Sequence, residues 1–163
     1  MTSDELLEVG LASMRWQCVL GGAFPLSLPL DAGTGAGCHD DPNPEPKPER
    51  LASLLGRHVL AGPVRDLVES TRSLSVSRHV LWGNVASAVN GAAPMIATSQ
   101  PAWADRSRVI ASLLLDQPPL RGASAASAGE GFRRRSCCLI YRAAPNAGGA
   151  VCGDCVLSSD LPP

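Results

Sequence analysis

The sequence predicts a mainly α-helical protein, a helical domain that ends in an irregular C-terminal cysteine loop. The chain has 163 residues, 45% of them apolar and 18% charged, which is enough to build one core. Several stretches repeat apolar residues at helical spacing, whereas none shows the strong alternation of a strand. Four of the six cysteines gather near the C-terminus among glycines. We therefore expect a helical domain over residues 1–130 and a cysteine segment over residues 131–163.

The first expected helix runs from Asp4 to about Leu20. Its apolar residues fall near helical spacing after a plausible cap at Thr2 or Ser3, and Gly21 and Gly22 end it. Residues 25–48 are rich in proline and glycine, which remove backbone donors and favour irregular structure. This stretch should form a surface loop.

Four further helices are expected. Residues 49–60 and 63–74 form the first two, with Pro63 at a tolerated first-turn position. A longer helix begins at Arg78 behind Ser75 or Ser77 as cap, and runs to about Gly91 or on to Ile96 with a break at Pro94. The last covers residues 103–115.

Charge and composition exclude some classes of function. The net charge of -1 and the absence of any RNP, zinc-finger or basic-helix pattern argue against nucleic-acid binding. The first residues, MTSDELLEVG, are acidic, the reverse of a secretory signal peptide, so we expect a cytoplasmic protein. Residues 80–104 carry no charge but contain many small and polar residues, which favours a buried helix over a membrane span.

The basic residues lie with the cysteines. Residues 1–75 carry six basic and ten acidic groups, and residues 76–163 carry eight and five. Reducing conditions keep cytosolic thiols free, so metal or redox chemistry is the first interpretation of the cysteines. The four that cluster are Cys137, Cys138, Cys152 and Cys155.

Four thiolates can hold either one zinc ion or a two-iron cluster. A single zinc usually takes its cysteines in pairs two to four residues apart, whereas Cys137 and Cys138 are adjacent and their side chains diverge in extended backbone. A cluster spreads its ligand positions over a larger object, which favours iron-sulfur modestly. The cluster with its four thiolates has a charge of about -2, and nearby cations would raise its reduction potential. The candidate cations are Arg133, Arg134, Arg135 and Arg142.

Other candidates are weaker. Cys18 is expected to be a buried apolar residue and Cys38 an ordinary surface thiol, while His58 and His79 are isolated. Residues that could support the cysteine loop or contact a substrate are Trp82, Asn84 and Tyr141, of which Asn84 must find hydrogen-bond partners if it is buried.

The motifs RRSCCLIYR and VCGDC, with thirteen residues between Cys138 and Cys152, resemble the C-terminal signature of the FhuF-like ferric-siderophore reductases. The resemblance extends to LLLDQPPLRG, to VLWGNVASAVNGAA and to LEVGLASMRWQCVLGGAFPLSLPL, and so covers most of the chain. Members of that family are typically longer at the N-terminus, so this chain resembles a shortened member, either genuinely or through a misplaced start. The spacer between the cysteine pairs is also longer than in the family.

The resemblance implies a 2Fe-2S cluster held by Cys137, Cys138, Cys152 and Cys155. It also implies an enzyme, a ferric-siderophore reductase, provided that the short N-terminus leaves the substrate site intact. The expected partners are a ferric siderophore and an electron donor such as a ferredoxin or a reductase, since no dinucleotide-binding motif is present. Peripheral membrane association stays open, as do two alternatives: a non-catalytic iron-sulfur binding or sensing protein, and a structural zinc module.

Overall fold

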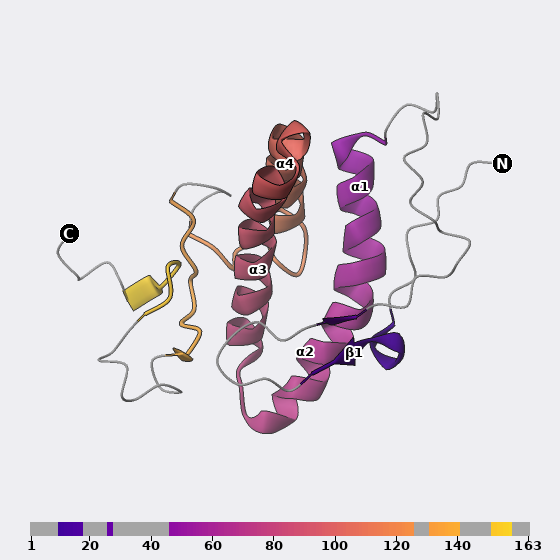
Figure 1. Cartoon of the computed structure of the whole chain (residues 1–163). Helices are drawn as coiled ribbons and strands as arrows, with labels where there is room; N and C mark the ends of the chain where they lie inside the picture. Colours follow the sequence, from indigo (N-terminus) through magenta and orange to yellow (C-terminus); the bar gives the residue numbers. More distant parts are fainter. Residues whose placement is uncertain (1–9, 18–25, 28–45, 126–130, 141–150, 158–163) are drawn as a thin grey trace.

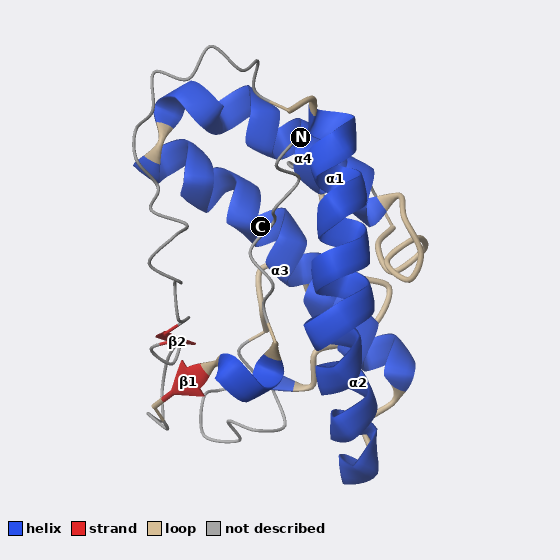
Figure 2. Ribbon diagram, turned by 90° about the vertical axis from the view of Figure 1, so that its right-hand side faces the viewer, coloured by secondary structure: helices blue, strands red, loops and turns tan. Residues whose placement is uncertain are grey.

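A computed structural model describes residues 10–17, 26–27, 46–125, 131–140 and 151–157 of the chain (Figure 1). Its regular structure is almost entirely helical, which confirms the predicted fold class (Figure 2). The C-terminal cysteine segment lies beside helix α3, on the side away from helix α1 (Figure 1). Cys18, Cys38, Tyr141 and Arg142 lie outside the described residues.

The helices expected over residues 49–60 and 63–74 form one continuous, bent helical segment. Helix α1 spans Pro48–Leu55, a π-helical stretch η2 spans Gly56–Val64, α2 spans Arg65–Thr71 and the 3-10 turn η3 spans Arg72–Leu74. The expected division between two helices appears as a kink at Gly62, whose backbone leaves helical geometry just before Pro63. Proline disfavours helical geometry in the residue before it, and glycine adopts the alternative most readily.

Helix α3 spans Arg78–Ser99. The side chain of Ser77 accepts a hydrogen bond from the backbone N-H of Val80 at 3.2 Å, which confirms the predicted cap. The predicted break at Pro94 is wrong, because the helix continues through it for another turn. The missing proline N-H removes one backbone bond, and the packing of α3 along α4 compensates for that loss.

Helix α4 spans Ala104–Leu115 after the 3-10 turn η4, Pro101–Trp103, as expected. It packs against both α3 and α1. The core between these helices is built from aliphatic residues, small residues and two aromatic rings: Ala52, Leu60, Val68, Trp82, Ala86, Leu114, Leu115, Leu120, Ala123 and Phe132. Phe132 belongs to the cysteine segment, so the same core holds the helices and anchors the start of that segment.

The helix expected from Asp4 to Leu20 is wrong where the structure describes it. Leu11–Ser13 form a 3-10 turn, η1, and strand β1, Arg15–Trp16, pairs antiparallel with strand β2, Leu26–Ser27. Leu11 and Trp16 are 38% and 64% exposed. Most helices depend on burying an apolar face against a core, and these side chains do not reach one.

Within the described part of the chain, no helix is both long and apolar enough to cross a membrane.

Candidate metal centre

The cysteine segment begins as an extended stretch beside the loop that follows α4. The N-H of Ala125 donates to the carbonyl of Arg133 at 2.8 Å, and the N-H of Arg135 donates to that of Ala123 at 2.9 Å. Burial then alternates along the segment: Phe132, Arg134 and Ser136 are buried, whereas Arg133 and Arg135 are exposed. This is the two-residue period of extended backbone. It separates the three consecutive arginines into one that faces inward and two that face solvent.

Ser136 fixes the segment against the first half of α3. Its hydroxyl donates to the carbonyl of His79 at 3.2 Å. The same oxygen lies where a side chain at Gly83 would begin, so any Cβ at position 83 would overlap it. The glycine therefore allows the residue just before Cys137 to lie directly on the helix backbone.

Arg134 connects α3 with the second pair of cysteines. Its side chain is buried, and its Nη1 donates to the side-chain oxygen of Asn84 on α3. Its Nη2 lies 3.6 Å from the sulfur of Cys152, and its backbone N-H donates to the carbonyl of Asp154 at 3.1 Å. One residue therefore contacts the helix and both ends of the Cys152–Asp154 turn.

Asp154 makes a further connection to the same helix. Its carboxylate accepts a hydrogen bond from the hydroxyl of Ser87, which precedes it by 67 residues in the sequence. Ser87 follows Asn84 by three residues, so both side chains project from neighbouring positions on α3. Helix α3 thus holds the cysteine segment on both sides of the residues between the cysteine pairs, through His79 and Asn84 on one side and Ser87 on the other.

The four predicted ligands lie on this platform. The sulfur atoms of Cys138 and Cys152 are 3.4 Å apart, and none of the four cysteines is in a disulfide. Cys155 is only 2% exposed, and its N-H donates to the carbonyl of Cys152 at 3.0 Å, which closes a tight turn. The other three cysteines are partly buried.

Backbone N-H groups point at two of the sulfurs. The N-H of Leu139 lies 3.4 Å from the sulfur of Cys137, and the N-H of Leu157 lies 3.3 Å from that of Cys155. Leu139 adopts left-handed backbone geometry with φ of 65°. This geometry costs a residue with a side chain about 1 to 2 kcal/mol, and such strain is concentrated at functional sites.

The environments of Cys138 and Cys152 differ. Burial raises the pKa of the Cys152 thiol, and the adjacent Cys138 sulfur raises it further. Burial also opposes ionisation of Cys138, but hydrogen bonding from the backbone of Ile140, and then from Cys152 and Arg134, outweighs it and lowers the pKa of that thiol. The close pair therefore favours a single negative charge placed on Cys138.

The four cysteines of this segment are the donor set that the site offers. The sulfurs of Cys138 and Cys152 are the pair that lies close together. Among the described residues, no three histidine, cysteine or acidic side chains are grouped closely enough to hold a metal ion. A 2Fe-2S cluster takes four thiolates, and N-H groups near the sulfurs stabilise its negative charge.

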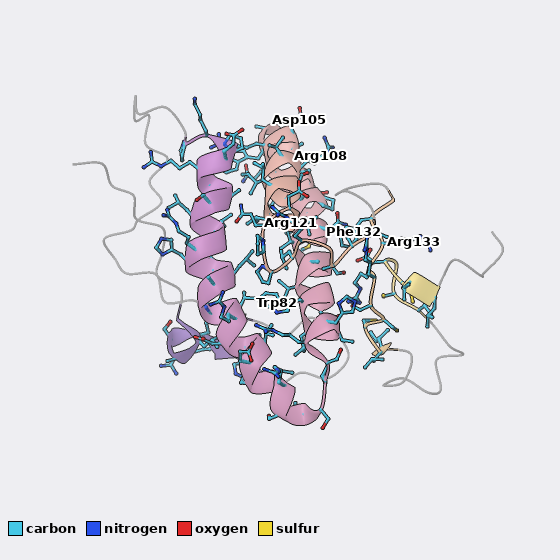
Figure 3. The ribbon with its side chains drawn as sticks, turned by 180° about the vertical axis from the view of Figure 1, so that it is seen from behind. Trp82, Asp105, Arg108, Arg121, Phe132 and Arg133 are labelled. Carbon is cyan, nitrogen blue, oxygen red and sulfur yellow. The ribbon has the colours of Figure 1, made fainter. Side chains whose placement is uncertain are left out.

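The remaining predicted residues have separate places. The side-chain oxygen of Asn84 accepts a hydrogen bond from the Arg134 side chain. Trp82 is buried in the core, and its indole N-H has no hydrogen-bond partner among the described residues. Arg133 lies on the side where the C-terminal segment leaves the helices, while Trp82 and Arg121 lie between the helices (Figure 3).

A cavity of about 270 Å³ opens at the N-terminal end of α3. Its charged and polar lining comes from Arg78, His79 and Arg121, and Trp82 forms part of its wall. Arg78 also forms an ion pair with Glu69 at 3.0 Å, and the Nε of Arg121 donates to the carbonyl of Asp116. The cavity therefore combines a largely apolar wall with two arginine side chains, beside the helix turn on which Ser136 rests.

Sequence reasoning missed Ser87, Ser136 and Asp154, the residues that fasten the segment to α3. Ser136 had no local signal, because residues 132–136 read FRRRS and show no polar-apolar alternation. The pairing of Ser87 with Asp154 had no local signal.

The fold and site together define a mainly helical iron-sulfur protein. Residues 134–157 match the family model of the FhuF 2Fe-2S C-terminal domain, so this segment is similar to that domain, and the match indicates a 2Fe-2S cluster as cofactor. The match covers the cysteine segment alone. No curated protein and no solved structure matches the chain significantly.

Proposed function

We propose that this protein reduces ferric iron held in a siderophore or similar chelate, one electron at a time, and thereby releases ferrous iron. The observation that carries the proposal is the FhuF 2Fe-2S match, which falls on the four cysteines and the buried arginine. FhuF domains are associated with ferric-siderophore reductases. A bound 2Fe-2S cluster supplies reversible one-electron chemistry without proton transfer.

The reaction has a simple physical basis. Siderophores hold ferric iron through hard oxygen donors, and ferrous iron, which is softer and less charged, is held far more weakly by the same ligands. One electron delivered to the chelate therefore releases the metal. No acid, base or nucleophile is needed, in keeping with a site built from thiols, amides and guanidinium groups.

In this proposal Cys137, Cys138, Cys152 and Cys155 hold the cluster, and the helical domain of residues 1–130 carries the cysteine segment of residues 131–163. The exposed side chains of Arg133 and Arg135 offer positive charge next to the first cysteine pair. They would attract an acidic electron donor, such as a ferredoxin or reductase, or an anionic chelate.

The cavity at the start of α3 is the candidate place for an anionic chelate. Arg78 and Arg121 line it, and the N-terminus of the 22-residue helix adds partial positive charge. Guanidinium groups suit carboxylate and other oxygen anions because they donate two parallel hydrogen bonds. From the sequence, Arg142 remains a proposed cation near the cluster, and Tyr141 remains a proposed residue for supporting the cysteine loop or contacting the substrate.

Anaerobic reoxidation tests the proposal. Dithionite first reduces the purified protein by one electron per cluster. The visible spectrum of the reduced protein is then followed after mixing with ferric siderophores. We expect rapid return of the oxidised spectrum, with one ferrous ion trapped by a colorimetric chelator for each reduced protein. The gallium complex of the same siderophore is the matched control, because it has similar shape and charge but accepts no electron.

The alternatives give different results. A coloured protein whose slow reoxidation no ferric chelate accelerates would contradict the reductase and favour an iron-sulfur protein that binds or senses. A colourless protein that contains one zinc per chain and does not incorporate iron and sulfide would contradict the cluster itself.

A further inference from the structure

Among the residues that the structure describes, the buried guanidinium of Arg134 has no carboxylate partner. Arg134 is only 4% exposed, and its Nε has no hydrogen-bond partner among the described residues. The other two nitrogens meet the neutral amide of Asn84 and the sulfur of Cys152. Among the described residues, the ion pairs of arginines lie on exposed surface, and none involves Arg134.

An unpaired buried charge is unfavourable, and arginine cannot relieve it by losing its proton. Proteins therefore pair such a charge with an anion. The anion that this site would gain is the cluster, whose thiolates include Cys152. The structure thus places a permanent positive charge against the second cysteine pair, inside the protein, where solvent screens it poorly.

We infer that Arg134 is the internal counter-ion of the cluster. Asn84 accepts a hydrogen bond from Nη1 of Arg134 and thereby orients Nη2 of the same side chain toward Cys152. Arg133 and Arg135 do not share this role, because they are exposed and face away from the helix. The inference depends on the 2Fe-2S cofactor and on Cys152 as its ligand. It is independent of the substrate, so it stands or fails separately from the proposed reductase activity.

The reduction potential should respond to this charge. Reduction adds one negative charge to the cluster, and a nearby cation stabilises the reduced form more than the oxidised form. A hydrogen bond to the sulfur acts in the same direction. Arg134 should therefore raise the midpoint potential, and whatever neutralises Arg134 should lower it.

The substitution Asn84→Asp is the most direct test. It keeps the size of the side chain and gives Arg134 a carboxylate partner, so it competes with the cluster for the guanidinium. The residue is on the exposed side of α3, which favours correct folding. Ala88→Asp is the matched control, since it adds the same charge at an exposed position one turn further along the helix.

The measurement is a redox titration of the cluster-loaded full-length protein by visible absorbance, together with the rate at which a chelator removes iron. For Asn84→Asp we expect at least a tenfold decrease in the equilibrium constant for reduction, about 59 mV in midpoint potential. We also expect faster iron loss. Ala88→Asp and Arg133→Gln should each change the logarithm of the equilibrium constant for reduction by less than a third of the change caused by Asn84→Asp.

A purely structural role for Arg134 gives the opposite result. Asn84→Asp would then tighten the anchoring, slow iron loss or leave it unchanged, and leave the potential at that of the parent protein. Either that result or an equal shift with Ala88→Asp would overturn the inference. Arg134→Met is the second variant, and it should lower the potential in the same direction, or release iron faster than Arg133→Gln does.

Discussion

Alanine at Gly83 should not stabilise the protein, even though alanine is the better helix former. In an exposed helix interior, glycine to alanine stabilises by about 1 kcal/mol. At position 83 the new methyl group would overlap the hydroxyl of Ser136. If that hydroxyl rotates away, the hydrogen bond to His79 is lost, at about 0.5 to 1.5 kcal/mol. If it cannot rotate, overpacking costs about 1 to 3 kcal/mol.

The same helix provides the control. Gly91 also lies inside α3, and nothing would meet a Cβ there within 4 Å. Gly91→Ala should therefore raise the thermal midpoint by about 2 to 4 °C, the shift expected for 1 kcal/mol in a chain of this size. Gly83→Ala should leave the midpoint unchanged or lower it by up to about 8 °C.

A double-mutant cycle isolates the contact. Ser136→Ala removes the overlapping oxygen, so Gly83→Ala should become stabilising in that background, with a coupling energy of about 1 to 3 kcal/mol. The assay is thermal unfolding of the cluster-loaded protein under anaerobic conditions, followed by tryptophan fluorescence. Equal stabilisation by Gly83→Ala and Gly91→Ala in the parent protein would refute the close approach of Ser136 to the helix.

Three further results are expected. Serine at any proposed ligand should abolish or strongly reduce the visible cluster absorbance, whereas Cys18→Ser and Cys38→Ser should retain it; loss with either control would contradict the ligand set of Cys137, Cys138, Cys152 and Cys155. Ser87→Ala removes a hydrogen bond to the Asp154 carboxylate, worth about 1.5 to 3 kcal/mol, and should speed iron loss to a chelator. An unchanged rate of iron loss would show that this contact does not hold the cysteine segment on α3. Arg121→Gln should raise KM for anionic ferric chelates with little change in kcat, and an equal effect on a neutral chelate would argue against an anion site in the cavity.

Local sequence signals were enough for much of the fold. Helices α1, α2 and α4 follow from apolar periodicity, and α3 begins where Ser77 supplies a cap. These features depend on interactions within a few residues, which a sequence displays directly. The expected helix at the N-terminus had the same apolar periodicity, but its described side chains do not pack against a core. The helix break expected at Pro94 did not occur because α3 packs along α4. Both errors arise because tertiary contacts decide whether a local preference is realised.

The cysteine motif indicated the class of cofactor through its resemblance to the FhuF 2Fe-2S signature, whereas the spacing of the four cysteines alone favoured an iron-sulfur cluster over zinc only modestly. The sequence could not distinguish among the three consecutive arginines. That distinction depends on Asn84, which precedes Arg134 by 50 residues, and on the link from Ser87 to Asp154. Pairs so distant in the chain are brought together only by the packing of the cysteine segment on α3. The sequence by itself therefore determined the chemistry of the ligands, while the tertiary structure decided which charge faces them, because burial depends on contacts that no local pattern encodes.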